Sequence, residues 1–221
     1  MTAEPTTPNT RITRLPERQR HDREALDDVL DSALVAHVAL VRDGVPVVLP
    51  LLHARDGDRL LLHGSTGGGL LRTAAAGAPV AVAVTVVDGL VVADSLFESS
   101  ANYRSAVVFG SCRVVPPEGR LEALRALSDH LLPGRWDEVR LPTPKELAAT
   151  LVLELPLDEA SVKVRTGPPS PADATAAPPP DGVPLWWGVV PLAQTPGEPV
   201  PAPDLPAGIP LPPSVQALLG G

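Results

Sequence analysis

Short runs of valine and leucine, separated by Asp-Gly pairs, constrain the fold of this chain more than any other feature of its sequence. The first three runs cover 35–41, 45–53 and 59–63, and the pairs at 43–44 and 56–57 separate them. Runs of this length that are rich in β-branched residues are typical of strands, and Asp-Gly is a strong signal for the tight turn of a β-hairpin. The pattern therefore predicts consecutive antiparallel hairpins, which favours a barrel or a sandwich.

The rest of the chain continues this alternation and adds a few helices. Further strand-like runs are 79–87, closed by Asp88-Gly89, then 90–93, 105–115, 150–155 and 160–164. Apolar residues at helical spacing predict helices over 22–34, 70–76, 118–132 and 144–149, the first with Asp22 as its N-cap. The sequence thus predicts a mainly β chain with a few helices, built around an antiparallel barrel.

Proline divides the chain into a core and two arms. There are 28 prolines in 221 residues, and the segments 1–20 and 167–184 are polar or rich in proline and alanine. Such segments do not form a packed core, so we expect an N-terminal arm over the first, a stiff linker over the second and a barrel domain over 21–166. The Pro-rich C-terminal arm, 185–221, contains two adjacent tryptophans, which need a surface to dock on.

Charge and cysteine content exclude some classes of function. The formal net charge is −8, which argues against a nucleic-acid partner, because surfaces that bind nucleic acid gather lysine and arginine. The single cysteine, Cys112, rules out an intrachain disulfide and suits a reducing compartment. No apolar run reaches the ~18 residues that a membrane span needs, and the N-terminus has no signal-peptide core. We therefore expect a cytoplasmic protein with no membrane partner.

The segment 63–72, HGSTGGGLLR, places glycines and small hydroxyl residues between a strand and a helix. Backbone N–H groups in such a turn are free to point at an anion, and a helix N-terminus adds partial positive charge there. A phosphate is the natural ligand, with Ser65, Thr66 and Gly67 around it. The alternative is a plain glycine-rich turn that joins two elements and binds nothing.

A second polar cluster lies at the start of an apolar strand, in the segment 99–110. The planar guanidinium of Arg104 is suited to hold a phosphate through two parallel hydrogen bonds, and Ser100 and Ser105 add hydroxyl donors. The alternative is an ordinary loop with a surface arginine. Arg72, in the helix after the glycines, either reaches back to the phosphate or lies on a solvated face.

The sequence contains no pattern that identifies a catalytic side chain. His53 and His63 end strand-like runs without a partner at metal-ligand spacing, so no metal site is expected. We interpret His53 as structural and His63 as a hydrogen-bonding partner of a ligand or of the backbone. There is no Gly-x-Ser-x-Gly elbow and no carboxylate pair suited to acid–base catalysis. These absences fit a protein whose reactive chemistry belongs to a bound cofactor.

Taken together, the first helix with its hairpins, the run 63–67 and the run 102–110 (NYRSAVVFG) resemble the pyridoxamine 5′-phosphate oxidase-related flavoproteins. The tail 187–192 (WGVVPL) is similar to that of their flavin-nucleotide-binding branch. The resemblance implies an antiparallel split β-barrel of the FMN-binding type, which forms a homodimer and binds FMN in two grooves between the subunits. It implies cofactor contacts at Leu49, Pro50, Leu51, His63, Ser65, Thr66, Gly67, Leu71, Arg72, Ser100, Tyr103, Arg104, Ser105, Trp186 and Trp187.

The resemblance also implies roles for these residues. The strand with Pro50 would run beside the flavin ring, the residues of the glycine-rich run would surround the ribityl phosphate, and one of the tail tryptophans would cover the ring or the substrate pocket. Tyr103 and its two neighbours would come from the adjoining strand or from the partner subunit. The chain lacks the dense set of arginines and lysines with which pyridoxamine phosphate oxidases hold a second, substrate phosphate, so a different small-molecule substrate is expected.

Three functions fit these observations. The first is an FMN-dependent oxidoreductase that acts on a small organic substrate, with the protein supplying orientation and electrostatics. The second is a flavin-binding or sensing module that turns over no substrate. The third keeps the barrel but holds deazaflavin or haem, with His63 as the contact.

Overall fold

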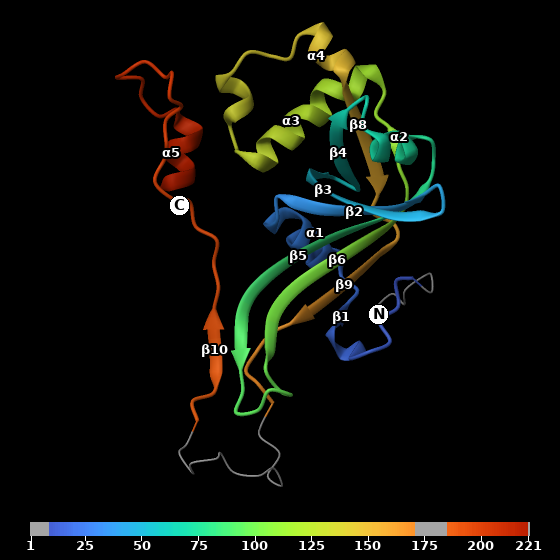
Figure 1. The fold of residues 1–221 in the computed structure, drawn as a ribbon, viewed down its shortest axis with the longest axis vertical. Coiled ribbons are helices and arrows are strands. Elements are labelled where there is room, and N and C mark those ends of the chain that lie inside the picture. Colours follow the sequence, from blue (N-terminus) through green and yellow to red (C-terminus); the bar gives the residue numbers. More distant parts are fainter. Residues whose placement is uncertain (1–8, 171–184, 221) are drawn as a thin grey trace.

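The valine- and leucine-rich runs form one antiparallel sheet that curls into an incompletely closed barrel (Figure 1). The computed structural model describes residues 9–170 and 185–220, and within them the sheet has ten strands. The strands are β1 (Gln19–Arg20), β2 (Val35–Arg42), β3 (Val45–Asp56), β4 (Arg59–Ser65), β5 (Pro79–Val92), β6 (Ser100–Ser111), β7 (Arg113–Val114), β8 (Thr150–Pro156), β9 (Ala160–Arg165) and β10 (Gly188–Pro191). Their order is β1-β9-β6-β5-β2-β3-β4-β8-β7, with β10 added on β5, so the predicted antiparallel, split barrel is confirmed.

Helices cover parts of this sheet. They are α1 (Arg23–Ser32), α2 (Gly69–Ala75), α3 (Arg120–Leu131), α4 (Pro144–Ala149) and α5 (Pro213–Leu219), with 3₁₀ turns η1 (Pro16–Arg18), η2 (Pro117–Gly119) and η3 (Arg135–Glu138). The four predicted helices are confirmed within two residues at each end, whereas α5 was not predicted. Within the described ranges, no helix is long and apolar enough to cross a membrane.

The core has two parts, which lie on opposite faces of β4. Leu60 and Leu62 point into the main core between the two halves of the sheet, together with Val38 and Val82. Leu61 points the other way, into a smaller core that α3 covers with Ala123 and Leu127. β4 is therefore buried on both faces, which explains its continuous run of leucines.

The register of the strands defines a face of the sheet that no helix of residues 9–170 and 185–220 covers. Residues directly opposite each other in an antiparallel pair lie on the same face. The pairs His37–Pro50, Ala39–Val48, Ala81–Phe109 and Thr85–Ser105 belong to one face, which we call the open face. Val38 and Val82 pair with each other on the opposite face, which α1 covers, and they are fully buried.

Local geometry confirms the signals that predicted the first elements. Asp43 and Gly44 both have positive φ values, 52° and 77°, as a two-residue hairpin turn of the primed type requires. The Asp22 side chain accepts a hydrogen bond of 2.9 Å from the Ala25 backbone N–H, so it is the N-cap of α1.

The prediction of a turn at Asp88-Gly89 is wrong. β5 runs without interruption from Pro79 to Val92, and this dipeptide forms a β-bulge against β6. The Asp88 carboxylate pairs with Arg104, and Gly89 lies under β10, where an added Cβ would come within 3.0 Å of the Val190 carbonyl oxygen. The strand predicted to start at 105 accordingly begins at Ser100 and completes a long hairpin with β5.

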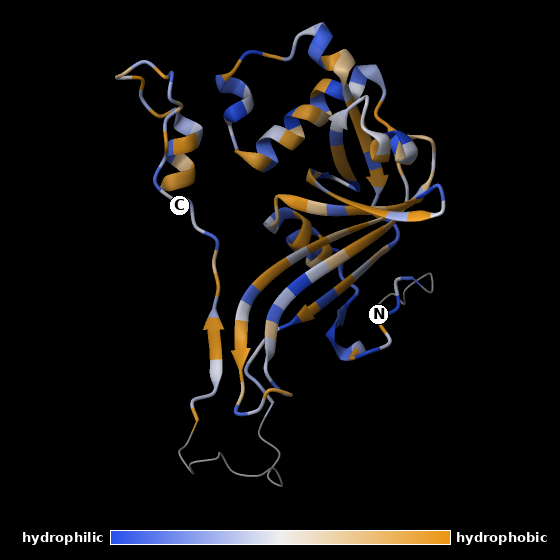
Figure 2. Ribbon diagram, viewed as in Figure 1, coloured by the Kyte–Doolittle hydropathy of each residue, from blue (hydrophilic) through white to orange (hydrophobic). Residues whose placement is uncertain are grey.

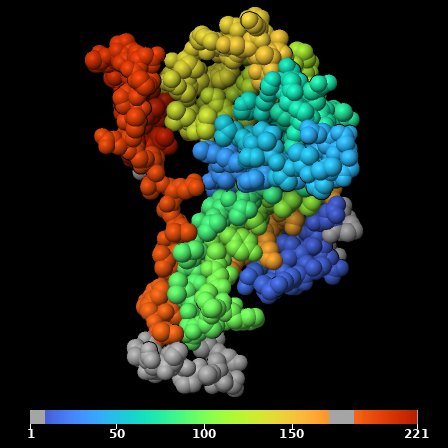
Figure 3. Space-filling model, viewed as in Figure 1, coloured from blue at the N-terminus to red at the C-terminus, as the bar shows by residue number. Residues whose placement is uncertain are grey.

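The C-terminal arm contacts the barrel at two separated points. β10 pairs with the far end of β5, and Ser214 at the start of α5 donates to Glu138 of η3 from its backbone N–H (2.8 Å) and its hydroxyl (2.5 Å). Figure 2 shows that β10 and α5 are the hydrophobic parts of this arm, and Figure 3 shows the arm along one side of the molecule. Residues 1–8, 171–184 and 221, which include most of the predicted linker, lie outside the described residues.

His53 in the core predicts how stability depends on pH. Its side chain is 1% exposed, and its Nε2 lies 3.1 Å from the Leu30 carbonyl oxygen. Burial lowers the pKa of His53 from 6.5 to about 4, so the unfolded chain binds a proton between these values and the folded chain does not. The free energy of unfolding should fall as the pH drops from about 6.5 to 4, by roughly 3 kcal/mol in total.

Urea unfolding across this pH range measures the effect. In a His53→Gln variant, which keeps a donor but has no titrating ring, this part of the pH dependence should disappear. An unchanged slope in the variant would contradict the assignment.

Candidate functional site

The predicted phosphate loop is a fixed turn between β4 and α2. Gly67 donates its backbone N–H to the Ser65 hydroxyl (3.2 Å), and Gly68 donates to the Ser65 carbonyl (2.9 Å). The Thr66 N–H donates to the carbonyl of Ala149 (3.0 Å), which ties the turn to the end of α4. Ser65 thus organises the turn through two of its atoms, and the loop is built before any ligand arrives.

An arginine that sequence reasoning missed lies over this loop. A Cβ added to Gly69 would come within 2.7 Å of Nη1 of Arg42, so the guanidinium lies against this glycine and would have to move if the position carried a side chain. Arg42 ends β2, 27 positions before the glycine in the chain, and the β2–β3 hairpin brings it there. Its place before the turn Asp43-Gly44 gave no signal that it would reach the loop.

Leu71 and Arg72, the two residues of α2 that were predicted to contact the cofactor, have different surroundings. Leu71 is buried in the main core. A Cβ added to Gly64 would lie only 2.5 Å from its Cδ1. Gly64 therefore lets α2 pack directly onto β4. Arg72 is exposed on the outer side of α2, next to the glycine loop in the chain.

The second polar cluster divides between the two faces of the sheet. Tyr103 and Ser105 lie on the open face, while Arg104 points toward α1. There its guanidinium donates two hydrogen bonds to Asp88 (3.0 and 3.1 Å) and one to Asp28 (2.6 Å). These carboxylates raise the pKa of Arg104 and neutralise it within the chain. Ser100 lies further along β6, near the tip of the hairpin.

The three residues of β3 that were predicted to contact the cofactor point alternately to the two faces of the sheet. Pro50 lies on the open face opposite His37, and Leu51 packs against the main core. Leu49 is exposed, because this half of β3 pairs with β2 on one side and has no strand on the other within the described residues. The strand predicted to run beside a flat ring is thus an accessible edge.

His63 lines a cavity on the outer side of β4. The cavity, of about 460 Å³, lies between β4, α3, η3 and α4, and its apolar lining includes Leu124, Trp136, Val139 and Pro142. Arg140 and Glu146 lie at its rim, paired at 2.7 Å. Within the described residues the His63 ring makes no hydrogen bond, and its Nδ1 is buried. Burial lowers the pKa of His63, so the ring is neutral at neutral pH.

The tryptophans lie far from the glycine loop of the same chain. Trp186 and Trp187 precede β10, which pairs with the far end of β5, whereas α2 adjoins the near end at Pro79. β5 has 14 residues, about 45 Å of extended strand. One chain therefore brings together Arg42, Ser65, Gly67 and His63 at one end, and holds its tryptophans at the other.

No group of three or more His, Cys, Asp or Glu side chains in residues 9–170 and 185–220 is arranged to hold a metal ion. The lone thiol of Cys112 is buried, which raises its pKa to about 11 and keeps it protonated. The ring of His63 lines the cavity and makes no hydrogen bond within the described residues, so it keeps a nitrogen with which it could coordinate a metal ion.

Comparison with known proteins finds relatives over nearly the whole chain. The sequence model of the family described as pyridoxamine 5′-phosphate oxidase matches residues 22–164. The structure of the FAD and heme binding protein from Mycobacterium smegmatis is 49% identical in sequence, with a TM-score of 0.83, over 91% of this chain and 97% of that one. The flavocytochrome Anf3 from Azotobacter vinelandii is 33% identical, with a TM-score of 0.87, over 97% and 98%. Among curated proteins, none matches.

The ion pairs of Arg104 predict a stability effect. Replacing it by alanine leaves Asp88 and Asp28 facing each other without their cation, in a region where the arginine side chain is only partly exposed. We expect Arg104→Ala to lower the free energy of unfolding by about 1–2 kcal/mol, measured by chemical denaturation. Arg72→Ala, on the solvated side of α2, is the matched control and should change it little. Equal stability of the two variants would contradict the structural role of Arg104.

Proposed function

The chain belongs to the pyridoxamine 5′-phosphate oxidase-like split-barrel family, and on that basis we propose that it is a redox protein that binds both a flavin and a haem. The names of the two relatives support this, since one binds FAD and heme and the other is a flavocytochrome. The observation on which the proposal depends is the unpartnered, neutral ring of His63 in an apolar cavity, two residues before the glycine loop. When bound, the flavin supplies two-electron chemistry and the haem one-electron chemistry.

The glycine loop and Arg42 fit the phosphate end of a flavin. The loop is held open by glycines at 67–69, and the guanidinium lies where a side chain on Gly69 would be. A guanidinium is a donor that a phosphate prefers, and the N–H groups of Thr66, Gly67 and Gly68 are already bonded to Ala149 and Ser65, so Arg42 would carry the contact. The family resemblance implies FMN, whereas the 49% identical relative binds FAD. We therefore propose FAD, and the mass of the cofactor released on denaturation distinguishes the two.

The His63 cavity fits a haem. A neutral imidazole nitrogen is a common axial ligand of haem iron, and apolar walls exclude water from the ring. Leu124, Trp136 and Val139 would form those walls. Arg140 at the rim is the cation that would face the propionates, in competition with its present partner Glu146. The sequence analysis considered a haem contacted by His63 as an alternative to a flavin-dependent oxidoreductase. We propose that this protein combines the two.

The two sites share one strand. His63 and Ser65 are two residues apart on β4, about 7 Å of extended chain, and their side chains are on the same face of the strand. The strand therefore fixes the spacing of the two cofactors, and its burial on both faces keeps that spacing rigid. Such an arrangement suits electron exchange between them.

A homodimer completes this proposal. The tryptophans of one chain lie about a full β5 length away from its own glycine loop, so they would cover the flavin of the partner. Tyr103 and Ser105 on the open face would then reach a flavin held by the other subunit.

We assign the protein oxidoreductase activity toward a small organic substrate. Reduction by NADH or NADPH followed by reoxidation with an acceptor would separate this activity from a binding module without turnover.

His63→Ala tests the haem site. The purified protein should show a Soret band and flavin absorbance, and the variant should lose the Soret band but retain its flavin. The exposed His21, at the start of α1, gives the matched control His21→Ala, which should keep both. A Soret band of unchanged position and intensity in His63→Ala would contradict the assignment of the ligand, and a native protein without flavin absorbance would contradict the proposed function.

Arg42→Ala tests the phosphate site. A hydrogen bond to a charged group contributes ~1.5–3 kcal/mol, so the variant should bind the flavin at least about tenfold more weakly. Titration of the deflavinated protein, followed by flavin fluorescence, measures this affinity. Arg113→Ala, an exposed arginine on β7, is the control and should bind as the native chain does. Native affinity in Arg42→Ala would remove this residue from the site.

A further inference from the structure

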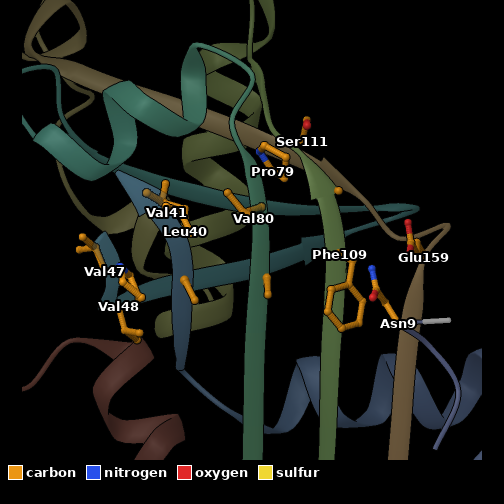
Figure 4. A pocket seen from close by; sticks show the side chains of 14 residues that line it. Asn9, Leu40, Val41, Val47, Val48, Pro79, Val80, Phe109, Ser111 and Glu159 are labelled. Atoms are coloured by element: carbon orange, nitrogen blue, oxygen red, sulfur yellow. The ribbon is translucent and has the colours of Figure 1, made fainter. Parts of the chain in front are cut away.

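The His63 cavity and a groove on the open face have walls of different kinds. The groove, of about 480 Å³, is lined mostly by side chains of the sheet itself, such as Val48 of β3 and Phe109 of β6 (Figure 4). The His63 cavity has a similar volume, but among its lining residues only His63 and Thr150 belong to strands. Hydrogen bonds between strands therefore keep the groove in shape, whereas the cavity depends on other contacts.

The outer wall of the cavity is the segment 134–142, which joins α3 to α4 and which we call the wall segment. The side chains that it contributes to the lining are those of Trp136, Val139, Arg140 and Pro142. The segment contains the 3₁₀ turn η3 and no strand. Gly134 at its start has a φ of 81°, a conformation that costs glycine no strain. A glycine at the end of an element suits a hinge.

Exposed ion pairs tie the wall segment to the neighbouring helices. Asp137 pairs with Arg125 of α3 at 2.8 Å, and both side chains are more than half exposed. Arg140 pairs with Glu146 of α4 at 2.7 Å, and both are again largely exposed. Ion pairs in contact with water contribute little to stability. The wall segment therefore needs a further contact to keep its position.

That contact joins Glu138 of the wall segment to Ser214 of α5. The Ser214 backbone N–H donates to Oε1 of Glu138 at 2.8 Å, and its hydroxyl donates to Oε2 at 2.5 Å. Arg135 donates to the same Oε2 at 3.1 Å. The hydrogen bonds from Ser214 lower the pKa of Glu138, so the carboxylate is charged at neutral pH. Because Ser214 is buried, water competes little for these bonds.

The rest of α5 adds little to this attachment. No residue of the helix belongs to either core, and its Leu218 and Leu219 are exposed. The strap that leads to it, residues 193–211, has no buried residue. The arm is thus fixed to the barrel by β10 at one end and by Ser214 at the other. The second attachment can break without opening the core.

We propose that the contact between Ser214 and Glu138 is a latch that positions the wall of the His63 cavity. When α5 is attached, Glu138 is held and the cavity is closed. When α5 leaves, the wall segment turns about Gly134 and opens the cavity to a flat, apolar cofactor. Trp136 transmits the movement, because it lines the cavity and lies two residues from Glu138 in the same 3₁₀ turn.

The latch makes Ser214 and Glu138 positioning residues, which touch no cofactor themselves. Attached, they keep the apolar wall against the ligand and exclude water from it. Released, they allow the ligand to enter or leave. That the ligand is haem rests on the proposed function, whereas the coupling of α5 to the wall segment does not.

Hydrogen exchange tests the coupling without reference to a cofactor. Ser214→Asp places a second carboxylate against Glu138 and should release α5. The backbone amides of the wall segment, followed by mass spectrometry, should then exchange at least about tenfold faster, as expected for the loss of a hydrogen bond to a charged group. Ala217→Asp adds the same charge on the exposed side of α5 and should exchange as the native chain does. Equal exchange in the two variants would overturn the proposal.

Haem retention tests the positioning role. Transfer of haem from the purified protein to apomyoglobin should be at least about tenfold faster in Ser214→Asp, with the Soret band at its native position because His63 is untouched. Ser214→Thr keeps the hydroxyl and should restore the native rate. Faster exchange of the wall segment without faster haem transfer would overturn the positioning role. A native chain without a Soret band would contradict the proposed function instead, and the exchange measurement would then decide on the latch alone.

Discussion

Burial of β4 on both faces is the constraint on which the rest of the structure depends. Leu60 and Leu62 fill the space between the two halves of the sheet, and Leu61 anchors α3 on the outer side; all three are fully buried. A strand fixed from both sides has no freedom to shift its register, because a slip of one residue would exchange its two faces. The glycine loop and His63 both come from the end of this strand, so their relative position is set by the core and not by the loops around them.

The two histidines of neighbouring strands show why one of them calls for a ligand. His53 lies in the core, and its Nε2 is placed to donate to the Leu30 carbonyl oxygen, which closes the end of α1. His63 makes no such bond within the described residues. A buried Nδ1 without a partner is common to both rings, so His63 differs in that its ring makes no hydrogen bond at all and lines an apolar cavity. A buried polar atom without a partner costs ~1–3 kcal/mol, and a hydrophobic residue would fill the cavity at lower cost. A haem iron would give the ring of His63 one partner, as the Leu30 carbonyl oxygen does for the ring of His53.

The sequence predicted the elements of the barrel well, because hairpin chemistry is local. Asp43-Gly44 fixes its turn through backbone conformation alone, and the period-2 runs identify the strands on either side. The same dipeptide at 88–89 was misread, since its conformation depends on Arg104 and on the arm strand β10, both distant in the chain. Arg42 was missed for a related reason: its place over the loop is produced by pairing between strands, which no spacing in the sequence records. Contacts of this kind decide the site, so the site is less predictable than the fold.

A split barrel leaves an edge that must be covered. Among the described residues, the first half of β3 pairs with β2 alone, and its exposed valines and leucine would template aggregation if nothing lay against them. The charged or proline-rich features that protect such edges are sparse here, with Pro46 and Pro50 in the strand as the main defence. The same chain exposes Leu96 and Phe97 at the opposite end of its longest hairpin. An open barrel thus leaves apolar side chains exposed at both ends of its sheet, because the described residues of one chain do not cover either end.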